Sequence, residues 1–125
     1  MPVGFQIVNF SRKELLSFGH VNASSAHELA GNEASAAITT WYMLSRRGDR
    51  IAFVSDTYKD WPFENSSSDD LLNYRDVTAE MIQELISRQI LADYGMLFVN
   101  PDEPESVFVR DLRNIWDRDN NDLLK

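Results

Sequence analysis

The middle of the chain carries its clearest pattern, from Asn32 to Ser55. Apolar residues recur there at helical spacing and predict one apolar helix face: Ala34, Ala37, Ile38, Trp41 and Leu44. Asn32 can cap the first turn with its side-chain oxygen, and Gly48 tolerates the positive φ that often ends a helix. The apolar run 51–54 is typical of a buried strand. A helix that leads into a strand is therefore the predicted centre of the fold.

Two segments of β type precede this centre, Gly4–Phe10 and Glu14–Val21, with a polar turn between them. Their spacing predicts a hairpin. Ser25 and Glu28 then have the spacing of a capping box, in which the two side chains satisfy each other's backbone N–H groups. A short helix is therefore expected up to Ala30, and it either joins the main helix through a kink at Gly31 or stands as a separate helix before it.

The second half of the chain predicts two helices and one more hairpin. Ser67 or Ser68 can cap a short helix over 69–74, and Thr78 is placed to cap an amphipathic helix over 79–89. We expect a turn at 93–95 and then strands over 96–100 and 107–112, joined by the acidic loop 101–106. Residues 117–125 are polar and predict a flexible tail.

These elements follow the order β-β-α-β-α-α-β-β, with no linker between them. They predict a single α+β domain over residues 1–116. Its sheet should be mostly antiparallel and built from an N-terminal and a C-terminal hairpin plus a central strand. The two main helices should pack on one face of this sheet.

The amino-acid composition excludes several classes of function but adds little about the fold. The 20 Asp and Glu residues outnumber the 12 Lys and Arg residues, so the net charge is −8. This charge argues against nucleic acid or an anionic membrane as a partner. The absence of cysteine excludes disulfides and thiolate chemistry. Without a leader or a membrane-length apolar run, we expect a cytoplasmic protein of bacterial type.

No catalytic, metal or cofactor motif is complete in this sequence. His27 and Glu28 begin like the zinc-protease motif, but the second histidine is replaced by Gly31. No glycine-rich phosphate loop and no Gly-x-Ser-x-Gly elbow occurs. We therefore predict no catalytic residue, no metal and no cofactor, and we lean toward a protein that is not an enzyme.

The segment 56–68 is long for a loop in a compact domain and contains three aromatic residues, Tyr58, Trp61 and Phe63. Aromatic side chains on loops are typical binding anchors, and Pro62 stiffens the chain between two of them. We therefore predict a binding surface that includes Asp60 with these aromatics. The alternative is that the loop folds back and plugs the end of the core, because exposed aromatics are costly in water.

The favoured hypothesis is a protein-binding module of the immunity, adaptor or regulatory kind. Its acidity suits a partner with a basic surface, which it would attract electrostatically. The alternative is a small-molecule binder or enzyme with a cleft lined by His20, Asp56 and Trp61. A homo-oligomer that uses an exposed sheet edge or apolar face also remains open.

Overall fold

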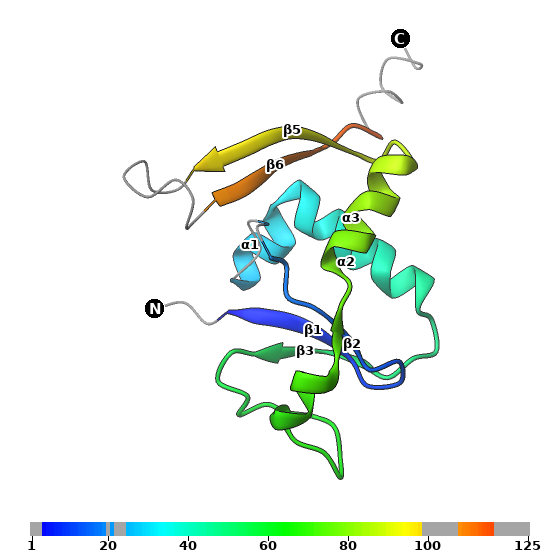
Figure 1. Ribbon diagram of the computed structural model, residues 1–125, viewed down its shortest axis with the longest axis vertical. Coiled ribbons are helices and arrows are strands. Elements are labelled where there is room, and N and C mark those ends of the chain that lie inside the picture. Colours follow the sequence, from blue (N-terminus) through cyan, green and yellow to red (C-terminus); the bar gives the residue numbers. More distant parts are fainter. Residues whose placement is uncertain (1–3, 20, 22–24, 99–107, 117–125) are drawn as a thin grey trace.

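The computed structural model describes residues 4–19, 21, 25–98 and 108–116. Its elements stack in layers along the long axis of the molecule (Figure 1). A two-stranded hairpin lies at one end, helices follow, and then come a four-stranded sheet and a long loop. The predicted acidic tip 101–106 and the predicted tail 117–125 lie outside the described residues. The predicted α+β class of a single domain is confirmed.

The larger sheet is organised around the first strand. It contains β1 (Phe5–Asn9), β2 (Glu14–Leu16), β3 (Ile51–Ser55) and β4 (Arg75–Asp76) in the order β3-β1-β2-β4. β1 runs antiparallel to both of its neighbours, as the predicted hairpin requires. The short β4 was not predicted and runs parallel to β2. The strand from the middle of the chain, β3, therefore lies at an edge of the sheet.

Short-range caps position the first two helices. α1 (Ala26–Gly31) begins with the predicted capping box, in which Ser25 Oγ accepts from the Glu28 N–H and the Glu28 side chain accepts from the Ser25 N–H. α2 (Glu33–Ser45) is capped by Asn32, whose Oδ1 accepts from the backbone N–H groups of Ala34 and Ser35 in the first turn. Both predicted caps are confirmed. A cap connects residues only a few positions apart, so it can be recognised without knowing the fold.

The third helix, α3 (Thr78–Ser87), begins in a different way from the one predicted. Thr78 is its first residue, the N-cap position is occupied by Val77, which has no side-chain oxygen to cap the helix, and Asp76 instead binds the first helical N–H. Asp76 Oδ1 accepts from the Thr78 N–H at 3.0 Å and from Thr78 Oγ1 at 2.7 Å, and Ser17 Oγ donates to the other oxygen of the same carboxylate. Burial alone would raise the pKa of Asp76, but these hydrogen bonds outweigh it and hold the pKa below its usual range.

The C-terminal hairpin forms a sheet of its own. β5 (Leu91–Phe98) pairs antiparallel with β6 (Phe108–Asn114). The turn predicted at 93–95 is wrong, because these residues form an irregularity inside β5 where the pairing register shifts between Asp93 and Met96. Gly95 has a φ of 116° there, a conformation that glycine adopts readily.

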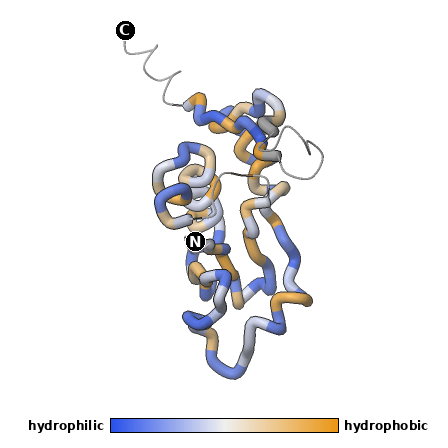
Figure 2. The backbone as a smooth tube through the Cα atoms, turned by 90° about the vertical axis from the view of Figure 1, so that its left-hand side faces the viewer, coloured by the Kyte–Doolittle hydropathy of each residue, from blue (hydrophilic) through white to orange (hydrophobic). Residues whose placement is uncertain are grey.

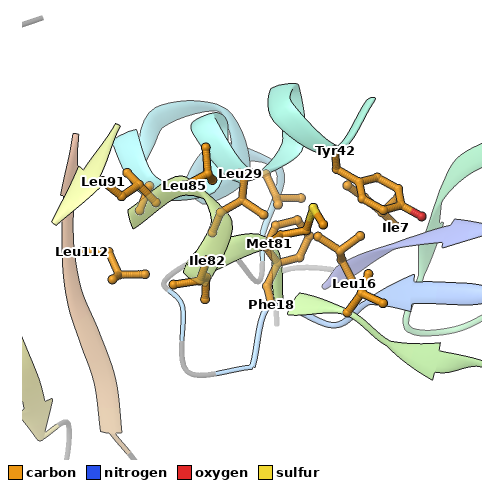
Figure 3. Close-up of a cluster of buried hydrophobic side chains, with 13 residues drawn as sticks. Ile7, Leu16, Phe18, Leu29, Tyr42, Met81, Ile82, Leu85, Leu91 and Leu112 are labelled. Atoms are coloured by element: carbon orange, nitrogen blue, oxygen red, sulfur yellow. The ribbon is translucent and has the colours of Figure 1, made fainter. Parts of the chain in front are cut away.

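The principal core lies where the helices meet the sheet on one side and the hairpin on the other (Figure 3). Ile38 lies in it as predicted, whereas Leu44 is 55% exposed and the fully buried Tyr42 takes its place. The buried members come from all three layers: Ile7, Leu16, Phe18, Leu29, Ala34, Ile38, Tyr42, Val77, Met81, Ile82, Leu85, Leu91 and Leu112. The core therefore joins the hairpin, the helices and the sheet into one unit.

A second, smaller core occupies the opposite face of the sheet. Successive residues of a strand point to opposite faces, so Ile7 points toward the helices and Val8 points away from them. Val8 and Val54 are fully buried on that second face, together with Phe63 from the long loop. At the end of the molecule beyond β3, the chain is mostly hydrophilic with short hydrophobic stretches (Figure 2), and Phe63 is the buried hydrophobic residue of the loop that packs on this face. The loop is therefore a layer of the fold.

Candidate functional site

The long loop, with the 3-10 helix η1 (Ser68–Asn73) that follows it, places the predicted aromatic residues in different environments. Phe63 is only 6% exposed, and its ring stacks on Phe10 with centroids 5.1 Å apart. Trp61 packs edge-on against Phe63 at 5.4 Å and is half-buried. Phe63 therefore serves the second core, as the alternative interpretation of the sequence proposed, and it is not an exposed anchor in this conformation.

Hydrogen bonds and cations hold this aromatic cluster in place. Trp61 Nε1 donates to Ser66 Oγ at 3.1 Å, and Ser66 Oγ donates to the Phe63 carbonyl at 3.0 Å. Lys13 Nζ lies 3.5 Å from the centroid of the Phe10 ring, within the range of a cation–π interaction. The indole of Trp61 is thus oriented by its own loop.

The two aspartates of the predicted site make intramolecular contacts. Asp60 accepts from the Ser55 N–H at 3.1 Å and from Ser55 Oγ at 2.8 Å, and these bonds hold the pKa of Asp60 below its usual range. Asp56 accepts from the Gly4 N–H at 3.1 Å. Asp60 therefore closes the turn after β3, and Asp56 ties that turn to the start of β1.

Tyr58 is the most exposed of the three aromatic residues of the loop, and its hydroxyl accepts a hydrogen bond from Gln6 Nε2 at 3.5 Å. Its side chain is 40% exposed and its φ is 58°, an unusual conformation for an aromatic residue. The turn is held by the Tyr58 N–H, which donates to the Ser55 carbonyl at 3.0 Å. The Trp61 N–H in turn donates to the Tyr58 carbonyl at 3.3 Å. Tyr58 is thus displayed on a turn whose backbone is already ordered.

The cleft predicted from His20, Asp56 and Trp61 is not assembled by the described residues. Asp56 borders a hollow of about 210 Å³, together with Tyr58, Gln6 and Ser17, but Trp61 is not among its lining residues. His20 lies outside the described residues. The volume falls below the range of about 300–1,000 Å³ that is usual for ligand pockets.

An apolar groove that the sequence did not reveal lies between the helices and the edge of the larger sheet. It has a volume of about 470 Å³ and is bordered by Phe5 and Phe53 of the strands and by Leu29 of α1. Phe53 is 43% exposed, although it lies in the middle of an apolar strand. The run 51–54 predicts a buried strand, and only the position of β3 at the sheet edge explains why Phe53 faces solvent.

A buried polar cluster is also present that no sequence pattern indicates. Glu14 is buried, and its Oε1 accepts from Tyr42 Oη at 2.9 Å and from Arg46 Nε at 2.7 Å. Burial, with the Glu14 carboxylate close by, raises the pKa of Tyr42 well above its usual range. Every member is paired, so the cluster is best explained as a structural link between β2 and the end of α2.

Other kinds of site find no support among the residues that the structure describes. Within those ranges, no three His, Cys, Asp or Glu side chains are grouped so that they could hold a metal ion. No helix within them is long and apolar enough to cross a membrane. Comparison of the chain with protein-family models, curated proteins and solved structures found no match.

Proposed function

We propose that this chain is a small acidic cytoplasmic protein-binding module, of the immunity, adaptor or regulatory kind. The observation that carries the proposal is Tyr58, a large aromatic side chain that is 40% exposed on a turn held by backbone hydrogen bonds. Tyrosine is enriched at the centres of protein interfaces because it combines apolar area with a hydroxyl group. Trp61 is half-exposed, and its backbone N–H donates to the Tyr58 carbonyl at 3.3 Å, so it belongs to the same turn.

The charge around Tyr58 suggests the nature of the partner. The segment 56–70 contains the carboxylates Asp56, Asp60, Glu64, Asp69 and Asp70 and a single cation, Lys59. All six of these residues are exposed. An acidic surface of this kind attracts a basic partner and accelerates its association. We therefore propose a protein with a basic surface as the partner.

The order of the loop favours binding. Ordering a loop on a partner costs free energy, and a loop that is already ordered avoids most of this cost. The contacts of Asp60, Ser66 and Phe63 hold the backbone on both sides of Trp61. Phe63 thus supports the surface from below, while Tyr58 and Trp61 would contact the partner.

The experiment compares Tyr58→Ala with Tyr94→Ala, which removes another exposed tyrosine from a different layer of the fold. Each immobilised protein is used to capture partners from native lysate at low and high salt. We expect a stoichiometric protein that wild type and Tyr94→Ala retain, that Tyr58→Ala loses, and that high salt releases. Equal capture by both variants, or no captured protein, would refute the proposed surface.

A further inference from the structure

The outer edge of β3 offers unpaired backbone groups. The Phe10 N–H donates to the Arg50 carbonyl at 2.8 Å, and the Asp56 N–H donates to the Gly4 carbonyl at 2.9 Å. In an antiparallel pair, such exchanges recur at every second residue. The register therefore directs the backbone of Ala52 and Val54 toward β1, and that of Ile51, Phe53 and Ser55 outward.

One end of this edge is already closed. The outward N–H of Ser55 donates to Asp60, and the Ser55 carbonyl accepts from the Tyr58 N–H at 3.0 Å. Within the described part of the chain, no such hydrogen bond is made by the backbone groups of Ile51 and Phe53. What remains open is a short edge of two outward residues, which is a template for another strand.

The side chains of these two residues add an apolar surface to the open edge. Phe53 lies directly opposite Ile7 in the register, so it projects on the face that bears the helices. Ile51 projects on the same face and is half-buried. Phe53 borders the apolar groove and is 43% exposed. The edge therefore combines free hydrogen-bonding groups with an uncovered aromatic ring.

The charges at the two ends of β3 are opposite. Arg47 and Arg50 precede the open edge, and Asp56 and Asp60 follow it, and all four residues are exposed. An antiparallel neighbour with the same sequence would place the basic end of each strand beside the acidic end of the other. This complementarity occurs twice in one symmetric contact, as in an isologous interface.

We infer that the edge of β3 is the contact between two copies of this chain. The two β3 strands pair antiparallel about a two-fold axis at Ala52, so that Ile51 of each copy lies opposite Phe53 of the other. This register uses the open backbone groups of both copies and stops where Ser55 is already bonded. It joins two four-stranded sheets into one and brings Ile51 and Phe53 of both copies together over the grooves.

The test rests on a substitution that removes one outward donor. Phe53→Pro removes the outward N–H at that position together with the ring, and proline is tolerated on a sheet edge where its nitrogen faces away from the neighbouring strand. The comparison with a variant that loses the ring alone therefore isolates the effect of the N–H. Phe53→Ala removes the ring and keeps the N–H. Leu72→Ala, at an exposed apolar residue away from β3, is the matched control. Mass is measured by sedimentation equilibrium from about 1 to 500 µM protein.

We expect wild type and Leu72→Ala to reach twice the chain mass of 14.4 kDa within this range. Dimerisation should weaken at least about tenfold in Phe53→Pro and less in Phe53→Ala. A monomeric wild type at every concentration would overturn the inference. The inference would also be overturned if a folded Phe53→Pro variant dimerised with the same dissociation constant as wild type.

A charge exchange tests the same contact without altering the strand. Arg47→Glu places two like charges together at each end of the contact and should weaken dimerisation several-fold. Adding Asp56→Arg restores opposite charges and should recover most of the loss. If the double variant is weaker than Arg47→Glu alone, the antiparallel arrangement is wrong. Because this test does not involve Phe53, it stands even if Phe53→Pro fails to fold.

Discussion

Replacing Phe63 with alanine tests whether the long loop is a layer of the fold. Phe63 is buried against Val8 and Val54 and stacks on Phe10. Burial of a phenylalanine is worth about 1.5–3 kcal/mol, and an aromatic pair adds about 0.5–1.5 kcal/mol. The cavity left behind adds a further cost, so that such substitutions usually lose about 3–5 kcal/mol. We expect Phe63→Ala to lower the free energy of unfolding by that amount.

The assay is urea-induced unfolding followed by tryptophan fluorescence. If the slope of the unfolding free energy against urea concentration is the same as in wild type, the substitution has changed only the stability and not the compactness of the protein. The control is Tyr58→Ala, in the same loop. Because Tyr58 is exposed, its replacement should change the free energy of unfolding by no more than about 0.5 kcal/mol.

A loss below about 1 kcal/mol for Phe63→Ala would refute this reasoning. It would mean that the loop leaves the sheet in solution and that Phe63 is available as a binding anchor together with Tyr58. Equal losses for both variants would contradict the distinction between a buried and a displayed aromatic residue. The result therefore decides between the two interpretations that the sequence left open.

Two further predictions concern buried or hydrogen-bonded carboxylates. Arg46→Met leaves the buried Glu14 without its cation and should lower the free energy of unfolding by about 3–5 kcal/mol. Tyr42→Phe removes one hydrogen bond to the same carboxylate and should lower it by about 1.5–3 kcal/mol. Urea unfolding of both variants checks this order, and the reverse order would contradict it. The pKa of Asp76 is lowered in the folded state, so its ionised carboxylate stabilises the fold. This contribution is fully present above the pKa of about 3.9 that Asp has in the unfolded chain, and it is lost as the pH falls through the lower pKa of the folded state. Asp76→Asn should therefore be less stable than wild type at about pH 7, and the difference in unfolding free energy should shrink below about pH 4; a constant difference would show that the carboxylate charge is not the cause.

The local parts of the fold could be predicted from the sequence. The caps at Ser25 and Asn32 depend on residues two or three positions away, so their pattern is visible without tertiary structure. The first hairpin and the amphipathic helix α3 follow from equally short spacings. These features explain why the α+β class was accessible.

The parts that depend on distant partners could not be predicted. The burial of Tyr42 in place of Leu44 depends on Glu14, which lies 28 residues earlier in the chain. The parallel strand β4 is too short to show a period, and it exists because β2 offers a free edge. The role of the aromatic residues in the loop also depends on distant partners, so the sequence alone fits a binding surface as well as it fits a core. The loop packs on the sheet because the second face of the sheet needs a cover, and no local sequence pattern indicates that need.

The strand order β3-β1-β2-β4 has a consequence for the growing chain on the ribosome. The hairpin at the centre of the sheet is made first, whereas both flanking strands come from later sequence. Neither edge of the nascent hairpin can be paired as in the native sheet until Ser55 and Asp76 have emerged, and Phe63 must follow before its second face is covered. Non-local pairing of this kind folds slowly and leaves apolar strands exposed meanwhile. Protection during synthesis, by the ribosome or by a chaperone, is therefore most needed for the hairpin formed by residues 5–16.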